Sequence, residues 1–555
     1  MKVLSAAEMQ ACDRATTERF GIPSLHLMRN ASAAVAEFAR RQFPQARRVT
    51  VLCGRGNNGG DGMMAARLLG GSGLQVTVLL LGTPDGIKGD AAEAWRKLQG
   101  AGNCRVSVIE SEEQFGHYHA ALEADLIIDA VLGTGFKPPM KGLALAAFEW
   151  IKRTGTPILA VDLPSGWPAD ETRGTMDEPV FPADAVVTFT APKPAHVFGQ
   201  LTRRWDQPIV VAPIGSPDEA VISELNLHWA GSAQRLLHQP RNFDSNKGNF
   251  GHVLVVGGCF GPAGGKAGAP AMTSLAALRA GAGLVTAAVP TAALPIVSGF
   301  APELMTLPLK ANEAGQISSE NLENLESLTK GATVLAIGPG MGQGADVKKF
   351  LTFFLFATKM PVVIDADGLN NLAADENSFP KTGNLLEKLG RERTVVLTPH
   401  PGEMARLAGI GTKQVQANRL ETARSFAVEH RVTVVLKGAH TLIAHPDGRV
   451  AVNTTGNPGM AKGGSGDLLT GVIAGLLAQF PQDAARAVEA AVHLHGLAAD
   501  IAVREKNEHT LLATDTLPCF SAAFRFHSRA RNGYVWLQGL PPDSSTANGS
   551  GEAAE

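Results

Sequence analysis

The chain has 555 residues, too many for one hydrophobic core, which predicts two or more domains. Its formal net charge of −2 and its 18% charged residues exclude a general electrostatic attraction to nucleic acids or membrane surfaces. The five cysteines form no CxxC pair, which argues against structural zinc and a disulfide framework and favours a reducing compartment. The N-terminus carries Glu8 and Asp13 instead of a signal peptide's apolar stretch, and no apolar run is long enough to span a membrane. We therefore expect a cytoplasmic protein.

The first 45 or so residues predict helices, with a capping box at Ser5-Ala6-Ala7-Glu8. A short apolar strand over residues 48–53 follows and runs into a glycine-rich turn, residues 54–62. A helix is expected from Met63. A strand, a glycine-rich turn and a helix form the βα unit that binds phosphates or nucleotides at the carboxyl end of a parallel sheet.

The alternation of strands and helices continues to about residue 212. Two of the predicted strands end in an aspartate followed by a loop of small residues, at Asp129 and at Asp162. Such loops line the crevice where ligands bind in an open α/β sheet. Both aspartates are therefore candidates for chemistry or cation binding, and the alternative for each is that it only caps its loop.

A mixed polar stretch over residues 216–248 is interpreted as the link between two domains. A second series of strands and helices begins at His252. Its strands run into polar or glycine-rich loops at residues 257–258, 338–342, 365–368, 398–403 and 437–441. A hairpin is expected through Asp447-Gly448. The loops of the two series differ, which indicates two domains and no internal duplication.

The segment Gly463-Gly464-Ser465-Gly466-Asp467 runs directly into an apolar helix over residues 468–477. Its glycines let the backbone approach a ligand closely and point several N–H groups at one spot, where the helix dipole adds positive charge. One interpretation is an anion-binding site with a catalytic Asp467. The alternative is an aspartate near a helix start after a flexible loop.

The loops at 57–62, 129–135 and 162–166 resemble those of the NAD(P)H-hydrate epimerase domain. The loops at 338–342, 398–403, 437–441 and 463–467 resemble the ADP-dependent NAD(P)H-hydrate dehydratase, a ribokinase-like domain. Their order and fusion match the bifunctional nicotinamide-nucleotide repair enzymes. The resemblance implies an α/β protein with two three-layer α/β/α domains. The two domains are a Rossmann-like epimerase domain at 1–225 and a ribokinase-like domain at 235–527. The composition of the remaining residues, 528–555, predicts a disordered tail.

The same resemblance implies the substrates NADHX and NADPHX, which are nicotinamide cofactors whose reduced ring has added water. The first domain would interconvert the R and S hydrates. The second would dehydrate the S hydrate to NAD(P)H with ADP as co-substrate, together with magnesium, giving AMP and phosphate. The resemblance also implies a potassium ion in the first domain and a homo-oligomer, with no nucleic-acid or membrane partner.

In the first domain the resemblance implies potassium ligands at Asn58, Asp129 and Ser165, and acid/base work for Asp162. Oxygen ligands of this kind suit a hard cation. The residues implied to contact the hydrate are Asn57, Asn58, Gly59, Gly60, Asp61, Gly133, Thr134, Gly135, Phe136, Lys137, Pro138 and Pro139.

In the second domain Asp467 is expected to take the proton of the hydrate's hydroxyl, as a general base. The other implied hydrate contacts are Ala269, Gly340 or Gly342, and His400. The adenine nucleotide would lie against Lys437, Gly438, Ala439, His440, Thr441 and Gly466. Without the resemblance, the alternative for Lys437 is a solvated loop lysine. The alternative for His400 is a histidine whose hydrogen bonds are satisfied beside two prolines.

Some positions depart from the family pattern. Cys259 and Ser465 replace the commoner Ser and Thr, and Arg29 and Ser32 replace the usual Glu and Gly. Two other readings stay open at this point. One is a ribokinase-like small-metabolite kinase with a non-catalytic dinucleotide-binding N-terminal domain, which would give a stable phosphorylated product. The other makes the first domain a binding or assembly module without turnover.

Overall fold

The computed structural model describes residues 1–262, 264–373 and 382–542. The chain divides into two compact units. One unit contains the residues up to Leu227 and those from Ser528 onward, and the other contains His228–His527. Each unit is a parallel or mainly parallel sheet with helices on its faces, which confirms the expected α/β fold class. The expected link at 216–248 is divided between the units at Leu227 and does not form a separate segment.

The sheet of the first unit has eight strands in the order β20-β7-β6-β5-β4-β1-β2-β3. All neighbouring strands are parallel except β20, which is antiparallel to β7. The strands are β1 (Arg48–Cys53), β2 (Gln75–Leu81), β3 (Arg105–Ile109), β4 (Leu126–Ala130), β5 (Ile158–Val161), β6 (Ala185–Phe189), β7 (Ile209–Ala212) and β20 (Val535–Gln538).

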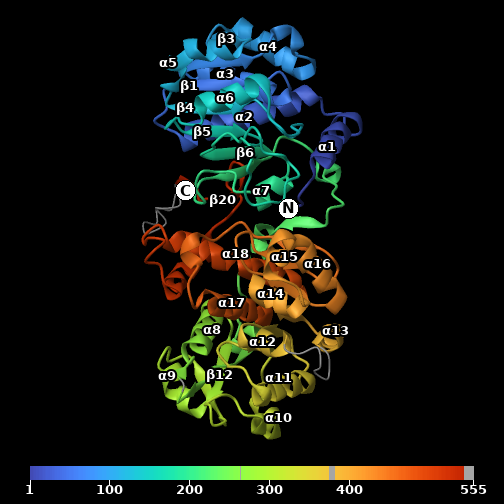
Figure 1. Cartoon of the computed structure of the whole chain (residues 1–555), viewed down its shortest axis with the longest axis vertical. Coiled ribbons are helices and arrows are strands. Elements are labelled where there is room, and N and C mark those ends of the chain that lie inside the picture. Colours follow the sequence, from blue (N-terminus) through green and yellow to red (C-terminus); the bar gives the residue numbers. More distant parts are fainter. Residues whose placement is uncertain (263, 374–381, 543–555) are drawn as a thin grey trace. The chain divides into compact units, whose positions relative to one another are not determined.

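Side chains of successive strand residues point to opposite faces of this sheet and build two cores. Val51 and Cys53 of β1 pack with helices α2, α3 and α4, whereas Leu52 packs on the other face with α6. Figure 1 shows these helices beside the strands. The helices of this unit are α1 (Ala6–Glu18), α2 (Ser24–Gln42), α3 (Asn57–Gly71), α4 (Gly89–Ala101), α5 (His119–Leu122), α6 (Gly142–Ile151) and α7 (Pro194–Phe198).

The residues from 528 onward do not form the expected disordered tail throughout. Val535–Gln538 form strand β20, and Val535, Trp536 and Leu537 are buried. The hydroxyl of Tyr534 donates to the carbonyl of Ala34 in α2 at 2.7 Å. The short aromatic and β-branched run therefore finds a sheet edge, although polar and glycine residues surround it in the sequence. The expectation for residues 543–555 lies outside the described residues.

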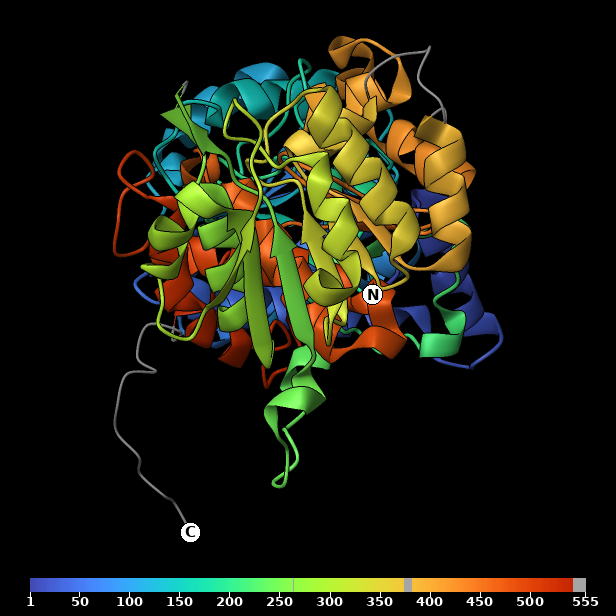
Figure 2. The ribbon, with the colours of Figure 1, turned by 90° about the horizontal axis from the view of Figure 1, so that it is seen from below.

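The sheet of the second unit has ten strands in the order β13-β12-β9-β14-β15-β16-β17-β18-β19-β8. The run from β13 to β17 is parallel, and β17, β18 and β19 pair antiparallel, which confirms the expected hairpin at Asp447-Gly448. Figure 2 looks onto some of these strands, drawn in green. The strands are β8 (Leu227–Trp229), β9 (His252–Val256), β12 (Leu284–Pro290), β13 (Met305–Leu309), β14 (Val334–Ile337), β15 (Val362–Ile364), β16 (Val395–Leu397), β17 (Thr433–Leu436), β18 (Leu442–Ala444) and β19 (Val450–Val452). A separate two-residue pair is formed by β10 (Phe260–Gly261) and β11 (Gly264–Gly265).

Helices α8 and α17 of this unit cross at very short range. A Cβ at Gly471 would lie 2.0 Å from the carbonyl oxygen of Thr273, so only glycine fits there. This crossing holds the start of α17 next to the start of α8. The helices are α8 (Gly268–Arg279), α9 (Leu294–Ser298), α10 (Leu325–Thr329), α11 (Ala345–Ala357), α12 (Asp367–Ala373), α13 (Thr382–Glu392), α14 (Pro401–Ala408), α15 (Thr412–Ala417), α16 (Arg419–His430), α17 (Ser465–Gln479), α18 (Ala484–Ala502) and α19 (Phe520–Arg525).

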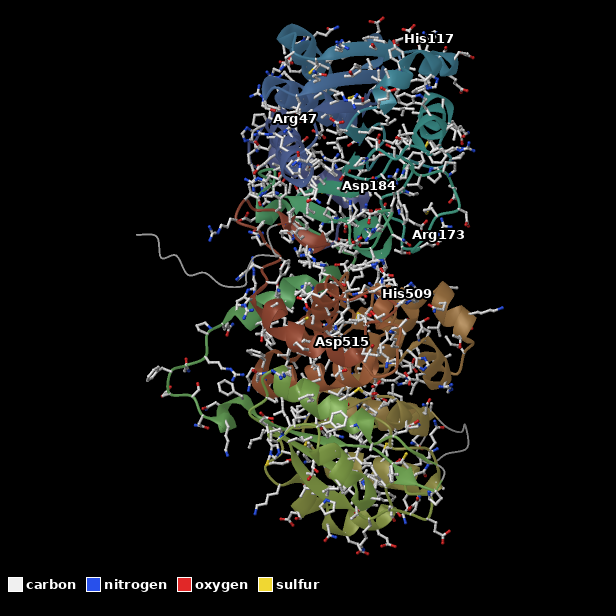
Figure 3. The ribbon with its side chains drawn as sticks, turned by 90° about the vertical axis from the view of Figure 1, so that its left-hand side faces the viewer. Arg47, His117, Arg173, Asp184, His509 and Asp515 are labelled. Atoms are coloured by element: carbon white, nitrogen blue, oxygen red, sulfur yellow. The ribbon has the colours of Figure 1, made fainter. Side chains whose placement is uncertain are left out.

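Asp184 and Asp515, which Figure 3 labels, accept hydrogen bonds near element ends of the two units. In the first unit Asp184 accepts from the backbone N–H of Ile158 at 2.8 Å and from Arg203 at 2.9 Å, which joins the starts of β5 and β6. In the second unit Asp515 accepts from the N–H of Leu512 at 2.8 Å. Within the described residues, no helix is both long and apolar enough to cross a membrane.

Candidate active sites

A cavity of about 960 Å³ lies at the carboxyl ends of the strands of the first unit. This is the end at which ligands bind in open α/β sheets, and the volume suits a small-molecule site. Of the residues implied by resemblance, those that line it are Asn57, Asn58, Asp61, Gly133, Thr134, Gly135, Phe136 and Asp162. Those that do not are Gly59, Gly60, Lys137, Pro138 and Pro139.

Gly59 and Gly60 are absent from the cavity lining because protein fills the space beside them. A Cβ at Gly59 would lie 1.9 Å from the carbonyl oxygen of Gly54, and one at Gly60 would lie 2.8 Å from Met28. These glycines let α3 approach β1 and α2 closely. Protein therefore occupies the Cβ side of both glycines, and their expected contact with the hydrate stays a prediction.

Asp129 and Ser165 meet in a buried network below the cavity. The Ser165 hydroxyl donates to Asp129 Oδ1 at 2.6 Å and the Ser165 N–H donates to Oδ2 at 2.7 Å. Ser165 Oγ also accepts from the N–H of Leu132 at 2.8 Å. Burial raises the pKa of Asp129 to about 6, although the hydrogen bonds from Ser165 and Val131 oppose the shift.

Asn58 lies beside the segment that carries Leu132, which contacts Ser165. The Cβ position of Gly133, the residue after Leu132, is 3.1 Å from Cβ of Asn58. The side-chain nitrogen of Asn58 is buried and has no hydrogen-bond partner among the described residues. The fold thus brings the three expected cation ligands, Asn58, Asp129 and Ser165, to one end of the sheet.

Asp162 follows β5 and is held in a strained backbone conformation with φ of +66°. Lys193 donates to Asp162 Oδ1 at 2.8 Å, and the Thr188 hydroxyl donates to the same oxygen at 2.8 Å. Burial favours a raised pKa for Asp162, but the charges of Lys193 and His196 and these hydrogen bonds outweigh it and lower the pKa. The site therefore keeps Asp162 ionised.

Sequence reasoning missed Lys193, which is almost completely buried and also lines the cavity. A lysine buried without a partner is costly, so its place four residues after the end of the apolar strand 185–189 is a signal that could have been used. Sequence reasoning also missed Asp13 of α1, which lines the same cavity. Nothing near Asp13 in the sequence points to this cavity.

In the second unit, the glycine-rich segment forms the start of α17 as expected. Gly464 precedes the helix with φ of +97°, a conformation that favours glycine. A Cβ at Gly466 would lie 3.3 Å from Nζ of Lys437 and 3.7 Å from Asp365. The N–H groups at this helix start and the Lys437 ammonium therefore converge on one place, which suits an anionic group.

Asp467 lies in the first turn of α17, next to this positive region. Burial raises its pKa to about 7, the nearby charges of Asp365 and Asp367 add to the shift, and Lys437 and Lys266 oppose it. A carboxylate that titrates near neutral pH has the proton affinity expected of a general base. This environment favours the catalytic interpretation of Asp467 over the helix-start alternative.

Lys437 is not a solvated loop lysine. Its Nζ donates to Asp365 Oδ1 at 2.9 Å and lies 3.8 Å from Glu403 Oε2. Although burial opposes it, these two carboxylates raise the pKa of Lys437. Asp365 also accepts from the hydroxyls of Thr398 and Thr470 at 2.7 and 2.9 Å. Asp365, which sequence reasoning placed in a loop without a role, connects β15 to β17 and α17.

The expected hydrate contacts Ala269 and Gly340 lie together. A Cβ at Gly340 would lie 3.1 Å from the Cβ of Ala269 and 2.7 Å from the carbonyl oxygen of Lys266. Lys266 in turn donates to Asp367 at 2.8 Å. The N–H of Gly342 donates to the same oxygen of Asp367 at 3.0 Å. Lys266, at the start of α8, is a second basic residue near Asp467 that sequence reasoning did not assign.

His400 is the N-cap of α14 and accepts at Nδ1 from the N–H groups of Gly402 and Glu403 at 3.0 and 3.3 Å. Its Nε2 therefore carries the proton, and its side chain is half exposed. Both interpretations of His400 are compatible with this arrangement, since Nδ1 is satisfied and Nε2, 3.5 Å from Glu403 Oε1, is on a half-exposed side chain and able to donate to a ligand.

Arg419, which sequence reasoning missed, forms hydrogen bonds that fix the loop at 437–441. Arg419 donates to the carbonyl of Ala439 at 2.5 Å and to those of Leu436 and Lys437 at 3.4 Å. Gly438 and His440 have φ of +133° and +52°. The loop is thus fixed in a sharp conformation beside the start of α17.

The two halves match the models of two protein families. Residues 24–195 match "YjeF-related protein N-terminus" and residues 253–519 match "NAD(P)H-hydrate dehydratase". The chain is 31% identical to the solved ADP/ATP-dependent NAD(P)H-hydrate dehydratase of Bacillus subtilis, covering 53% of this chain and 96% of that one, with a TM-score of 0.44.

Full-length relatives contain both halves. The bifunctional NAD(P)H-hydrate repair enzyme of Escherichia coli is 34% identical over 92% of this chain and 91% of its own. That of Moorella thermoacetica is 40% identical over 93% of this chain and 95% of its own. This chain therefore belongs to the family of bifunctional NAD(P)H-hydrate repair enzymes.

Proposed function

We propose that the two units catalyse successive steps of one repair reaction. The first unit interconverts the R and S hydrates of NADH and NADPH in the cavity at Asp162. The second unit removes water from the S hydrate with ADP and releases NAD(P)H, AMP and phosphate. The observation that carries this proposal is Asp467, which has its pKa raised to about 7 by burial and neighbouring carboxylates at the start of α17. A poised base beside an anion-binding helix start is the arrangement that phosphoryl transfer to a hydroxyl needs.

The chemistry of the second step follows from the leaving group. Hydroxide leaves poorly, whereas a phosphorylated hydroxyl leaves as phosphate. Asp467 takes the hydroxyl proton as the oxygen attacks the terminal phosphoryl group of the nucleotide. The N–H groups at the start of α17 and the ammonium of Lys437 stabilise the charge on the transferred group. Lys437 is suited to this because Asp365 holds it at 2.9 Å beneath Gly466.

The choice of nucleotide rests on the relatives. The Bacillus subtilis protein is described as ADP/ATP-dependent and was co-crystallised with ATP and Mg²⁺. We propose that this chain uses ADP in the same way and that magnesium enters with the nucleotide. The loop at 437–441, fixed by Arg419, is the proposed site for the adenine nucleotide.

We also propose a potassium ion at Asn58, Asp129 and Ser165. The Asp129 side chain is completely buried, and no basic side chain pairs with it in the part of the chain that the structure describes. A cation coordinated by oxygen atoms would balance this charge. When bound, potassium would balance the charge of Asp129, while Asp162, held ionised by Lys193, faces the cavity. The expected homo-oligomer and cytoplasmic location stay predictions.

One assay tests the proposal against the kinase alternative. Mixed R and S hydrates are incubated with the enzyme and ADP, with ATP, or with no nucleotide, and NAD(P)H absorbance is followed. Recovery of absorbance that requires the nucleotide supports the proposal. A stable phosphorylated product without recovered absorbance would instead identify a small-metabolite kinase.

A further inference from the structure

Asp61 is fixed at the wall of the first cavity by the glycines on either side of it. A Cβ at Gly60 would lie 2.8 Å from Met28 of α2, and one at Gly62 would lie 2.4 Å from the Cβ of Ala130 in β4. No larger residue fits at either position without displacing its neighbours. The first turns of α3 are therefore pressed against α2 and β4, and Asp61 is held rigidly where it lines the cavity.

The surroundings of the Asp61 carboxyl are acidic, and one of its oxygens is buried. Its Oδ1 is buried and has no hydrogen-bond partner among the described residues. The charged groups that act on it are Asp162, Asp13 of α1 and Asp90 of α4. Burial first, and then these three negative charges, raise the pKa of Asp61 well above its ordinary value. An unpaired buried carboxylate beside other carboxylates is costly, so this environment favours the protonated form of Asp61.

Asp162, in the same cavity, has the opposite character. Lys193 and Thr188 each donate to its Oδ1 at 2.8 Å. These contacts keep Asp162 ionised, as described above. One cavity thus contains a protonated and an ionised carboxyl group whose environments push their pKa values apart, which is the arrangement that divides acid and base roles in many enzymes.

We propose that Asp61 is the proton donor that releases the hydroxyl group of the hydrate during epimerisation, with the ionised Asp162 as its electrostatic partner. This inference rests on the proposed epimerase function of the first unit. It changes the roles expected from the sequence, in which Asp162 was the acid/base residue and Asp61 only contacted the substrate.

The step balances without a co-reactant. Water adds to a reduced nicotinamide ring at the carbon next to the ring nitrogen, where the nitrogen lone pair stabilises positive charge. The Asp61 proton passes to the hydroxyl oxygen, the C–O bond breaks with its electron pair on oxygen, and water departs. The nitrogen lone pair forms a C=N bond, and the Asp162 carboxylate stabilises the resulting cation.

The reverse sequence completes the inversion. Water adds to the opposite face of the same carbon, the C=N electrons return to nitrogen, and the Asp61 carboxylate takes a proton from the added water. The products are the other hydrate and the protonated Asp61 with which the cycle began. Asp61 is therefore a catalytic residue in this scheme, and Lys193, which acts through Asp162, is a positioning residue.

The test compares Asp61→Asn, Asp162→Asn and the exposed control Asp85→Asn in the full-length chain. Conversion of pure R hydrate to S hydrate is measured by chromatography without nucleotide, as kcat/KM against pH. The wild type should lose activity at low pH as Asp162 becomes protonated and at high pH as Asp61 ionises. Loss of a positioned proton donor typically costs about 100 to 10,000-fold, so Asp61→Asn should lose that much of kcat and also lose the alkaline limb. Asp162→Asn should lose the acid limb, and Asp85→Asn should resemble the wild type.

The controls separate the possible failures. Dehydration of pure S hydrate with ADP measures the second unit of the same molecules, and thermal unfolding shows whether the first unit folds. If the wild type does not interconvert the hydrates, the proposed epimerase function fails. If the wild type does so and a folded Asp61→Asn stays within about threefold, or keeps the alkaline limb, Asp61 is not the proton donor. If Asp61→Asn does not fold, Asp61→Glu replaces it: retained activity with a shifted alkaline limb supports the proposal, and an unshifted limb overturns it.

Discussion

Lys437 and Asp365 form a partly buried ion pair, Nζ to Oδ1 2.9 Å, next to the backbone of Gly466. The pair joins the ends of β15 and β17 to the start of α17, although its members are separated by 72 residues in the sequence. The pair places a positive charge where the nucleotide phosphates are proposed to bind. It also places the negative charge of Asp365 near Asp467, where it raises the pKa of that carboxyl.

The first prediction concerns Asp365→Asn. Dehydration by the wild type should fall as pH drops through about 7, because Asp467 becomes protonated and is lost as a base. Removing the negative charge of Asp365 lowers the pKa of Asp467, so this acid limb should move to lower pH. The measurement is kcat/KM for the S hydrate against pH. An unchanged midpoint in a folded, nucleotide-binding variant would show that Asp467 does not set the limb.

The second prediction concerns the proposed potassium site. Asp129→Ala removes the buried carboxylate that Ser165 contacts at 2.6 and 2.7 Å. Epimerisation should fall and should lose any dependence on potassium concentration, while dehydration of pure S hydrate should be unchanged. Equal loss of both activities would contradict this assignment and point to general unfolding.

The third prediction concerns the packing of α3. Gly62→Ala places a Cβ 2.4 Å from that of Ala130, and such overpacking typically costs about 1–3 kcal/mol. Gly100→Ala in α4 is the matched control, because no atom lies within 4 Å of its added Cβ. The control should be neutral or up to about 1 kcal/mol more stable. Urea unfolding followed by a probe in the first unit measures both, and equal stability of the two variants would contradict the packing argument.

The fourth prediction concerns the C-terminal strand. A chain that ends at residue 531 lacks β20, whose Val535, Trp536 and Leu537 are at most 8% exposed. Burying side chains of this size contributes roughly 1.5–3 kcal/mol each, so the thermal transition of the first unit should fall while that of the second does not. An unchanged first transition would mean that β20 adds nothing to this sheet.

Strong local patterns made the fold and part of the sites predictable. An apolar strand that ends in an aspartate-bearing loop placed Asp162 correctly at the carboxyl end of its sheet. A glycine-rich segment before an apolar run placed Asp467 correctly in the first turn of a helix. The same argument as for Asp162 predicted that Asp129 and Ser165 lie close together, and they are within hydrogen-bond distance. In these cases the candidate site residues lie next to the sequence pattern that predicts their position.

The other site residues and strand β20 depend on tertiary contacts that no local sequence pattern predicts. Lys193 and Asp13 reach the first cavity from a loop and from α1. The tight approach of α3 to β1 and α2 at Gly59 and Gly60 is likewise not visible in the local sequence. Strand β20 was missed because its apolar run is short and its partner β7 lies more than 300 residues away in the sequence.

The most direct test of the two-step account is the amount of NAD(P)H recovered from an equal mixture of R and S hydrates with ADP, measured with two variants on one time scale. The wild type should recover all of the absorbance. Asp162→Asn should recover only the S half at the early time, because the dehydratase is intact and the R hydrate is no longer supplied to it. Asp467→Asn should recover almost none, since loss of a general base typically costs about 100 to 10,000-fold. If Asp467→Asn dehydrates within about threefold of the wild type, or if Asp162→Asn recovers both halves as fast, the assignment of the two steps to these two aspartates is wrong.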